Sequence, residues 1–213
     1  GRDELRKLIV DLIAANNVPN SGIRIVLTGG ESPNGYAIGH PTLFAINEPI
    51  SSLPEEHFTK GIKLMSHEYL RDLPEVKSIN YLMGIYKQPD IQISGAVDML
   101  YHWQGQISEL TRSNFFIVDR DHTVITPGKG VLHGVNRKHV IEMARRYYPV
   151  MERDMFMDEL QTAREAFITG TTKKITPVYQ VDEMVIGEGH PGPVTLDLQR
   201  KYNDYINEWI ASH

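Results

Sequence analysis

FITGTTKKITPV, at residues 167–178, places two short apolar runs on either side of Gly170-Thr171-Thr172. Short runs rich in β-branched residues are typical of strands, and a glycine followed by two hydroxyl residues is typical of a turn. The segment therefore predicts a strand over 166–169, a turn, and a second strand over 175–178. Further strands are predicted on the same grounds at 23–27, 41–46, 61–65, 96–103 and 115–118, the last leading through a hairpin at 119–122 into 123–125.

Helical periodicity is clearest at the two ends of the chain. A helix ending near Asn16 is predicted by apolar residues with helical spacing: Leu5, Leu8, Ile9, Leu12 and Ile13. Another is predicted from Val194 onward, burying its apolar face: Tyr202, Tyr205, Ile206, Trp209 and Ile210. Two more are predicted over 78–88 and 136–146. Because strands and helices do not alternate strictly, the predicted fold class is α+β.

Bulk composition excludes several classes of protein. A net charge of -5 argues against a surface for nucleic acid or an anionic membrane. The chain has no cysteine, which excludes disulfides, thiolate zinc sites and cysteine nucleophiles. The histidines lack ligand spacing, so no metal site is expected. With no apolar run long enough for a membrane helix and no signal-peptide pattern, a cytoplasmic location is expected.

Four segments combine polar residues in ways that packing alone does not explain. They are EVKSINYL at 75–82, ISELTRSNFF at 107–116, LHGVNR at 132–137, and the segment at 167–178. Taken singly, each has an ordinary interpretation: a surface lysine, a carboxylate in a salt bridge, an aromatic in the core, a simple turn. The order of all four along one chain is the unusual observation.

In this order the four segments resemble class IV aminotransferases, the family of branched-chain and D-amino-acid transaminases, and the likeness runs over nearly the whole chain. The resemblance implies the large domain of the fold type IV enzymes, with a remnant of their small α/β domain. It places the small-domain remnant at 1–47 and the large domain at 57–213. The segment between them, 48–56, has two prolines and no periodicity, which predicts an interdomain linker. It also implies the cofactor pyridoxal 5′-phosphate and a homodimer.

The resemblance assigns Lys77 as the catalytic lysine that binds the cofactor covalently. Glu109 would face the ring nitrogen and keep it protonated, so that the ring accepts electrons. Tyr81 would hydrogen-bond the phenolic oxygen of the ring. The phosphate would lie at the helix start formed by Val135 and Asn136, where free N–H groups attract an anion.

The same resemblance gives the turn at 170–172 two roles. The Thr171 hydroxyl would lie beside the cofactor phosphate. Gly170, Thr171 and Thr172 would offer backbone N–H groups to the carboxylate of the substrate. The substrates implied are an amino acid, branched-chain or similarly apolar, and a 2-oxo acid such as 2-oxoglutarate.

Some features of the sequence depart from the family pattern. The small-domain motifs that complete the family's active site are absent, which would make this chain a truncation and leaves an inactive fragment as one interpretation. Asn34 and Tyr36 stand where D-amino-acid transaminases carry an arginine and a histidine for the substrate carboxylate. Asn136 stands where the family usually has threonine. D-amino-acid transaminase, aminodeoxychorismate lyase and a cofactor-free interaction protein remain as alternatives.

Overall fold

The computed structural model describes residues 1–18 and 20–212, and the chain divides into two compact units, Gly1–Ser52 and Leu53–His213. The boundary between the units falls inside the predicted linker at 48–56. No helix in the described part of the chain combines the length and the apolar character that crossing a membrane requires.

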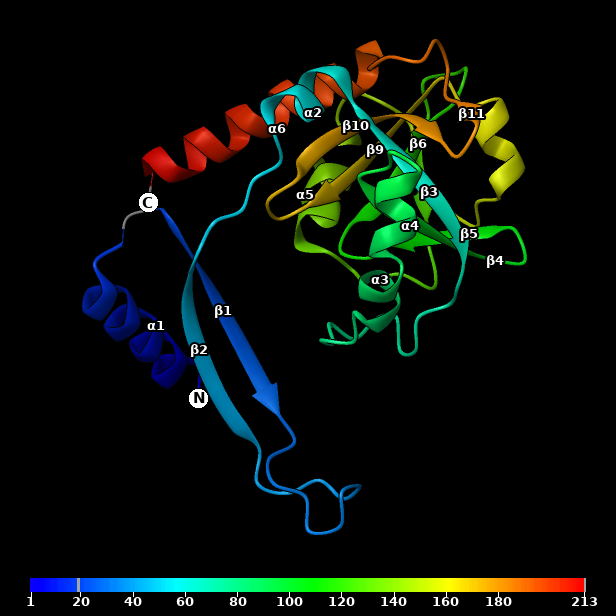
Figure 1. Cartoon of the computed structure of the whole chain (residues 1–213). Coiled ribbons are helices and arrows are strands. Elements are labelled where there is room, and N and C mark those ends of the chain that lie inside the picture. Colours follow the sequence, from blue (N-terminus) through cyan, green and yellow to red (C-terminus); the bar gives the residue numbers. More distant parts are fainter. Residues whose placement is uncertain (19, 213) are drawn as a thin grey trace. The chain divides into compact units, whose positions relative to one another are not determined.

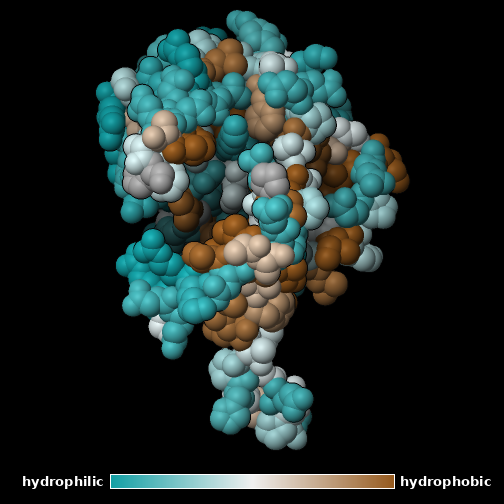
Figure 2. Space-filling model, turned by 90° about the vertical axis from the view of Figure 1, so that its left-hand side faces the viewer, coloured by the Kyte–Doolittle hydropathy of each residue, from teal (hydrophilic) through white to brown (hydrophobic). Residues whose placement is uncertain are grey.

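The smaller unit consists of one helix and one hairpin (Figure 1). Helix α1 (Arg2–Asn16) is followed by strands β1 (Ser21–Thr28) and β2 (Thr42–Pro49), which pair antiparallel with Ser21 opposite Pro49. The helix and both strands confirm the sequence prediction, although β2 runs further toward the linker than predicted. None of the described residues of this unit is buried. Large apolar side chains such as Leu27 and Leu43 are exposed instead, and hydrophobic residues are visible at the molecular surface in Figure 2.

The larger unit is built around a sheet that closes on itself. Its strands are β3 (Ile62–Glu68), β4 (Asp98–Trp103), β5 (Gln106–Leu110), β6 (Asn114–Val118), β9 (Glu165–Gly170) and β10 (Lys174–Val181). They pair in the order β10-β3-β4-β5-β6-β9, and β9 pairs with β10 as well as with β6, which closes the ring. Strands β7 (Val124–Pro127), β8 (Val150–Arg153) and β11 (Met184–Val185) extend the sheet outside this ring.

Helices cover the outside of this sheet (Figure 1). They are α2 (Glu55–Lys60), α3 (Leu82–Tyr86), α4 (Gln88–Ile93), α5 (Val135–Ala144), the 3-10 helix η1 (Met157–Gln161) and α6 (Pro193–Ser212). The strand β6 shows how the layers are filled, because successive side chains point to opposite faces. Phe115 belongs to the cluster shared with β3, β4 and β5, whereas Phe116 stacks on Phe167 at 4.7 Å beneath α5 and α6.

The structure corrects the sequence prediction in several places. The helix predicted over 78–88 begins only at Leu82 and is divided at Lys87, because Pro89 starts a new helical segment there. Strands β5, β8 and β11 and helices α2 and η1 were not predicted. The last helix buries Tyr202, but Tyr205, Trp209 and Ile210 are 42%, 54% and 64% exposed, because the C-terminal turns of α6 extend past the edge of the sheet (Figure 1).

A buried carboxyl group from the sheet holds the start of α6. Glu165 on β9 accepts hydrogen bonds from the backbone N–H groups of Val194 at 3.0 Å and Thr195 at 2.7 Å. These are donors that a helix leaves unpaired at its first turn, where its dipole also favours a negative group. Gly192 allows this approach, since a Cβ there would lie 2.2 Å from Cδ of Glu165.

We therefore expect Glu165→Ala to lower the free energy of unfolding by roughly 2–3 kcal/mol, because the backbone N–H groups of Val194 and Thr195 would be buried without an acceptor. Denaturant unfolding followed by circular dichroism measures the change. Glu183→Ala is a suitable control, since that side chain is 94% exposed. A Glu165 variant as stable as the Glu183 variant would show that the carboxyl group does not hold the helix.

Candidate active site

A cavity of about 260 Å³ lies within the larger unit. Four segments that are distant in sequence form it: the irregular segment before α3, the β5–β6 turn, the start of α5, and the end of β9. Its wall consists of Arg71, Lys77, Ser78, Tyr81, 109–114, 132–137 and 169–171. The sheet brings the segments together because β6 lies between β5 and β9 and pairs with both.

Most of the residues singled out from the sequence meet in this one cavity. Its wall includes Lys77, Tyr81, Glu109, Val135, Asn136, Gly170 and Thr171. Thr172 belongs to the same turn as Thr171 but does not form part of the wall. The cofactor and substrate roles of these residues stay predictions.

Lys77 lies in an irregular segment between β3 and α3 rather than at a helix start. The residue is exposed and forms part of the cavity wall. Within the described part of the chain, no ion pair or hydrogen bond engages its amine. The amine is therefore available to a molecule that enters the cavity.

Glu109 is the buried acid of the cavity, with 4% of its surface exposed. Its Oε2 atom accepts hydrogen bonds from the backbone N–H of Leu132 at 2.9 Å and from Asn114 Nδ2 at 3.3 Å. Burial raises the pKa of this carboxyl group, and the Leu132 N–H and the Arg71 guanidinium oppose the rise. Glu109 thus holds its proton to a higher pH than an exposed glutamate does.

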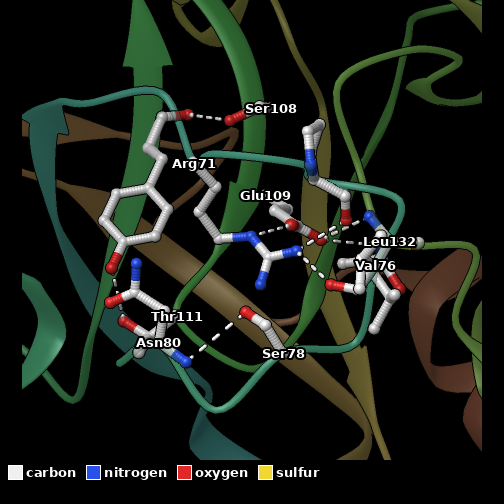
Figure 3. A network of polar contacts seen from close by, with 11 residues as sticks. Arg71, Val76, Ser78, Asn80, Ser108, Glu109, Thr111 and Leu132 are labelled. Atoms are coloured by element: carbon white, nitrogen blue, oxygen red, sulfur yellow. Dashed lines mark hydrogen bonds and ion pairs between the residues drawn. The ribbon is translucent and has the colours of Figure 1, made fainter. Parts of the chain in front are cut away.

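Arg71 is a residue of the site that sequence reasoning missed. Its Nε lies 2.9 Å from Oε1 of Glu109, close enough for an ion pair, although neither atom has a well-aligned hydrogen bond. Its Nη2 donates to the backbone carbonyls of Pro74 at 2.6 Å and Val76 at 3.3 Å. Figure 3 shows the guanidinium between the acid and the segment that leads to Lys77. Arg71 therefore contacts both the carboxylate of Glu109 and the backbone of the segment that carries Lys77.

The start of α5 faces the cavity with unpaired backbone donors. Gly134 precedes the helix with no side-chain cap, so the N–H groups of the first turn are available to an anion. A Cβ at Gly134 would lie 2.4 Å from Oδ1 of Asn114, so any other residue here would have to displace the Asn114 side chain. Asn136 donates from Nδ2 to the Gly170 carbonyl at 2.7 Å, which fastens the helix start to the turn after β9.

Comparison with known proteins identifies the family. The family described as Amino-transferase class IV matches residues 1–181 of this chain. The chain belongs to the class IV aminotransferases. Its membership confirms the resemblance found in the sequence, and the closed sheet is the large domain of the fold type IV enzymes.

Several relatives of this class IV chain carry named activities. It is 28% identical to the branched-chain-amino-acid aminotransferase of Pseudomonas aeruginosa, over all of this chain and 73% of that protein. It is also 28% identical to a D-alanine aminotransferase of Listeria monocytogenes, over 96% of this chain and 74% of the relative. Among solved structures, the branched-chain amino acid aminotransferase of Escherichia coli superposes with a TM-score of 0.85 at 27% identity, covering 96% of this chain and 71% of that one.

Arg71 offers a direct test of how this aminotransferase site is organised. We expect Arg71→Met to lower kcat/KM by roughly 10–100-fold, the range found when a group that orients a metal ligand is removed. Loss of the guanidinium also removes a charge that lowers the pKa of Glu109, so the acid limb of the pH–rate profile should move to higher pH. Arg146→Met, at an exposed arginine outside the cavity, is the matched control. An acid limb unmoved in the Arg71 variant would contradict the coupling.

Proposed function

We propose that this class IV aminotransferase transfers an amino group between a branched-chain or similarly apolar amino acid and a 2-oxo acid such as 2-oxoglutarate, with pyridoxal 5′-phosphate as cofactor. The observation that carries the proposal is the placement of Lys77, Glu109 and the start of α5 on the wall of one cavity. An amine, a buried acid and an anion-binding helix start are the three groups that a phosphorylated pyridine aldehyde requires. The branched-chain amino acid aminotransferase of Thermobaculum terrenum, 25% identical with a TM-score of 0.78, was solved in its PLP-form.

The cavity has unused polar atoms that suit this cofactor. Oγ of Ser113 is buried and has no hydrogen-bond partner in the described structure, and Oε1 of Glu109 has only its ion pair with Arg71. Buried polar atoms without partners are costly, so such atoms in a cavity wall indicate a ligand that completes them. A protonated ring nitrogen would complete Glu109. The phosphate would be held by Val135 and Asn136 at the start of α5 and by the Thr171 hydroxyl.

Each residue then has a defined task in the reaction. When bound, the cofactor supplies a carbonyl carbon that bonds to amines and a ring that accepts the electron pair from the substrate carbon. Lys77 would hold the cofactor through its amine and would carry the proton that leaves the substrate α-carbon. Glu109 holds the proton on the ring nitrogen. The turn at 170–172 orients the substrate carboxylate through backbone N–H groups.

A D-amino-acid transaminase is the second candidate. The observation in its favour is that D-alanine aminotransferases stand among the relatives at 28% identity, beside proteins named as branched-chain aminotransferases at 28% and 30%. Both activities would use the same lysine and the same acid, so the choice depends on the groups around the substrate side chain. A homodimer and a cytoplasmic location belong to the proposal as well.

The test is to titrate the purified chain, and the full-length protein if the chain is a part of one, with pyridoxal 5′-phosphate while recording the visible spectrum. We expect a visible absorption band, and after borohydride reduction a cofactor-modified peptide that contains Lys77. A modified peptide containing another lysine instead would overturn the assignment. Amine-donor assays with L-leucine, D-alanine and aminodeoxychorismate then decide the substrate, and sedimentation measures the oligomeric state.

A further inference from the structure

Arg112 is a cation on the wall of the cavity that none of the predicted roles uses. It lies in the short turn between β5 and β6, two residues before Asn114, and it is an exposed residue of the cavity wall. Its carbonyl oxygen would lie 3.4 Å from a Cβ placed on Gly170. Asn114 also pairs with Thr169 in the sheet. The Arg112 turn and the turn at 170–172 are therefore neighbours at the same side of the cavity.

The cavity wall carries more positively charged than negatively charged side chains. Arg71 pairs with Glu109 at 2.9 Å, and Arg137 pairs with Glu152 at 2.9 Å. Among the described residues, no ion pair or hydrogen bond is formed by the guanidinium of Arg112 or by the amine of Lys77. In the proposed function Lys77 binds the cofactor, and the start of α5 binds the cofactor phosphate. Arg112 is then the one arginine of the wall that is left for an anionic group of the substrate.

We propose that Arg112 binds the α-carboxylate of the substrate, together with the backbone N–H groups of the 170–172 turn. The proposal rests on the proposed function and deepens it by assigning a side chain to substrate recognition. A guanidinium presents parallel N–H donors that match the two oxygens of a carboxylate. Its position beside the 170–172 turn lets side chain and backbone act on the same carboxylate.

This assignment has a consequence for substrate choice. Both the amino donor and the 2-oxo acceptor carry an α-carboxylate, so Arg112 would serve both halves of the reaction. Dicarboxylic and monocarboxylic substrates would depend on it equally. Its contribution would therefore favour amino acids as a class over simple amines, and the apolar or acidic character of the side chain would be decided by other groups.

The experiment uses the cofactor-loaded protein and two unreactive carboxylates, 4-methylpentanoate and glutarate. Calorimetric titration gives the Kd of each for the wild type, Arg112→Gln and Arg112→Lys. We expect Arg112→Gln to raise both Kd values by a similar factor, roughly 10–100-fold, the size of a lost charge-assisted pair of hydrogen bonds. The lysine variant should retain part of the affinity. Arg120→Gln, in the β6–β7 turn outside the cavity wall, should match the wild type.

Three results would overturn the assignment of Arg112. These are unchanged Kd values in Arg112→Gln, a loss confined to glutarate, and a loss of pyridoxal 5′-phosphate affinity with carboxylate binding intact. The last would assign the arginine to the phosphate. Failure of the proposed function gives a different result, because the wild-type protein would then show no visible band with the cofactor.

Discussion

Replacing Lys77 with alanine is expected to abolish the visible band of the cofactor-loaded protein and to lower kcat/KM by about 10⁴-fold. The lysine acts as covalent ligand and as proton carrier, and a positioned acid–base group alone contributes up to about 10⁴-fold. In the structure Lys77 forms part of the cavity wall, and its amine has no ion-pair or hydrogen-bond partner among the described residues. Absorbance spectroscopy and steady-state kinetics with L-leucine and 2-oxoglutarate measure both effects.

Lys87→Ala provides the matched control for this experiment. That lysine is ten residues further on, pairs with Asp90 at 2.9 Å, and does not form part of the cavity wall. It should leave the band and the rate close to those of the wild type. A small primary amine such as methylamine should restore part of the activity of Lys77→Ala, because it can carry the missing proton. A Lys77→Ala variant that keeps the band would remove this residue from its proposed role.

The sequence predicted which residues meet in the cavity better than it predicted the structure around them. Glu109 and the 170–172 turn were found because each lies in a recognisable motif beside a strand. Strand β5 was not predicted, because Ile107, Ser108, Glu109 and Leu110 are all buried and give no alternation of polar and apolar side chains. Lys77 was placed at a helix start, although the helix begins at Leu82.

Arg71 shows most clearly what local reasoning from one sequence misses. Nothing in its neighbourhood marks it, since an arginine followed by Asp72 reads as part of a charged surface loop. Its function depends on contacts with a glutamate 38 positions later and with backbone carbonyls. Contacts of that kind leave no periodic pattern in the sequence. Similarly, the amphipathic pattern of α6 could not reveal that its last turns extend past the sheet that covers Tyr202.

The second large effect is expected from Glu109→Gln, which should lower kcat by roughly 10²–10³-fold, the usual cost of removing one electrostatic group from an active site. The glutamine keeps the size of the side chain but cannot carry the negative charge that holds a proton on the ring nitrogen. Burial raises the pKa of Glu109, so lowering the pH neutralises it earlier than an exposed glutamate. The wild-type rate should therefore fall on the acid side as Glu109 gains a proton.

Glu109→Gln tests whether protonation of Glu109, rather than of another group, lowers the rate at acid pH. If ionised Glu109 sets the acid limb of the wild-type profile, Glu109→Gln should be slow at every pH and should lose that limb, since it has no proton to gain there. Glu142→Gln, at an exposed position on α5, should keep both the wild-type rate and the limb. An acid limb that persists unchanged in Glu109→Gln would mean that another group titrates there. Full activity of the variant would mean that the cavity holds its ligand without an acid at this position.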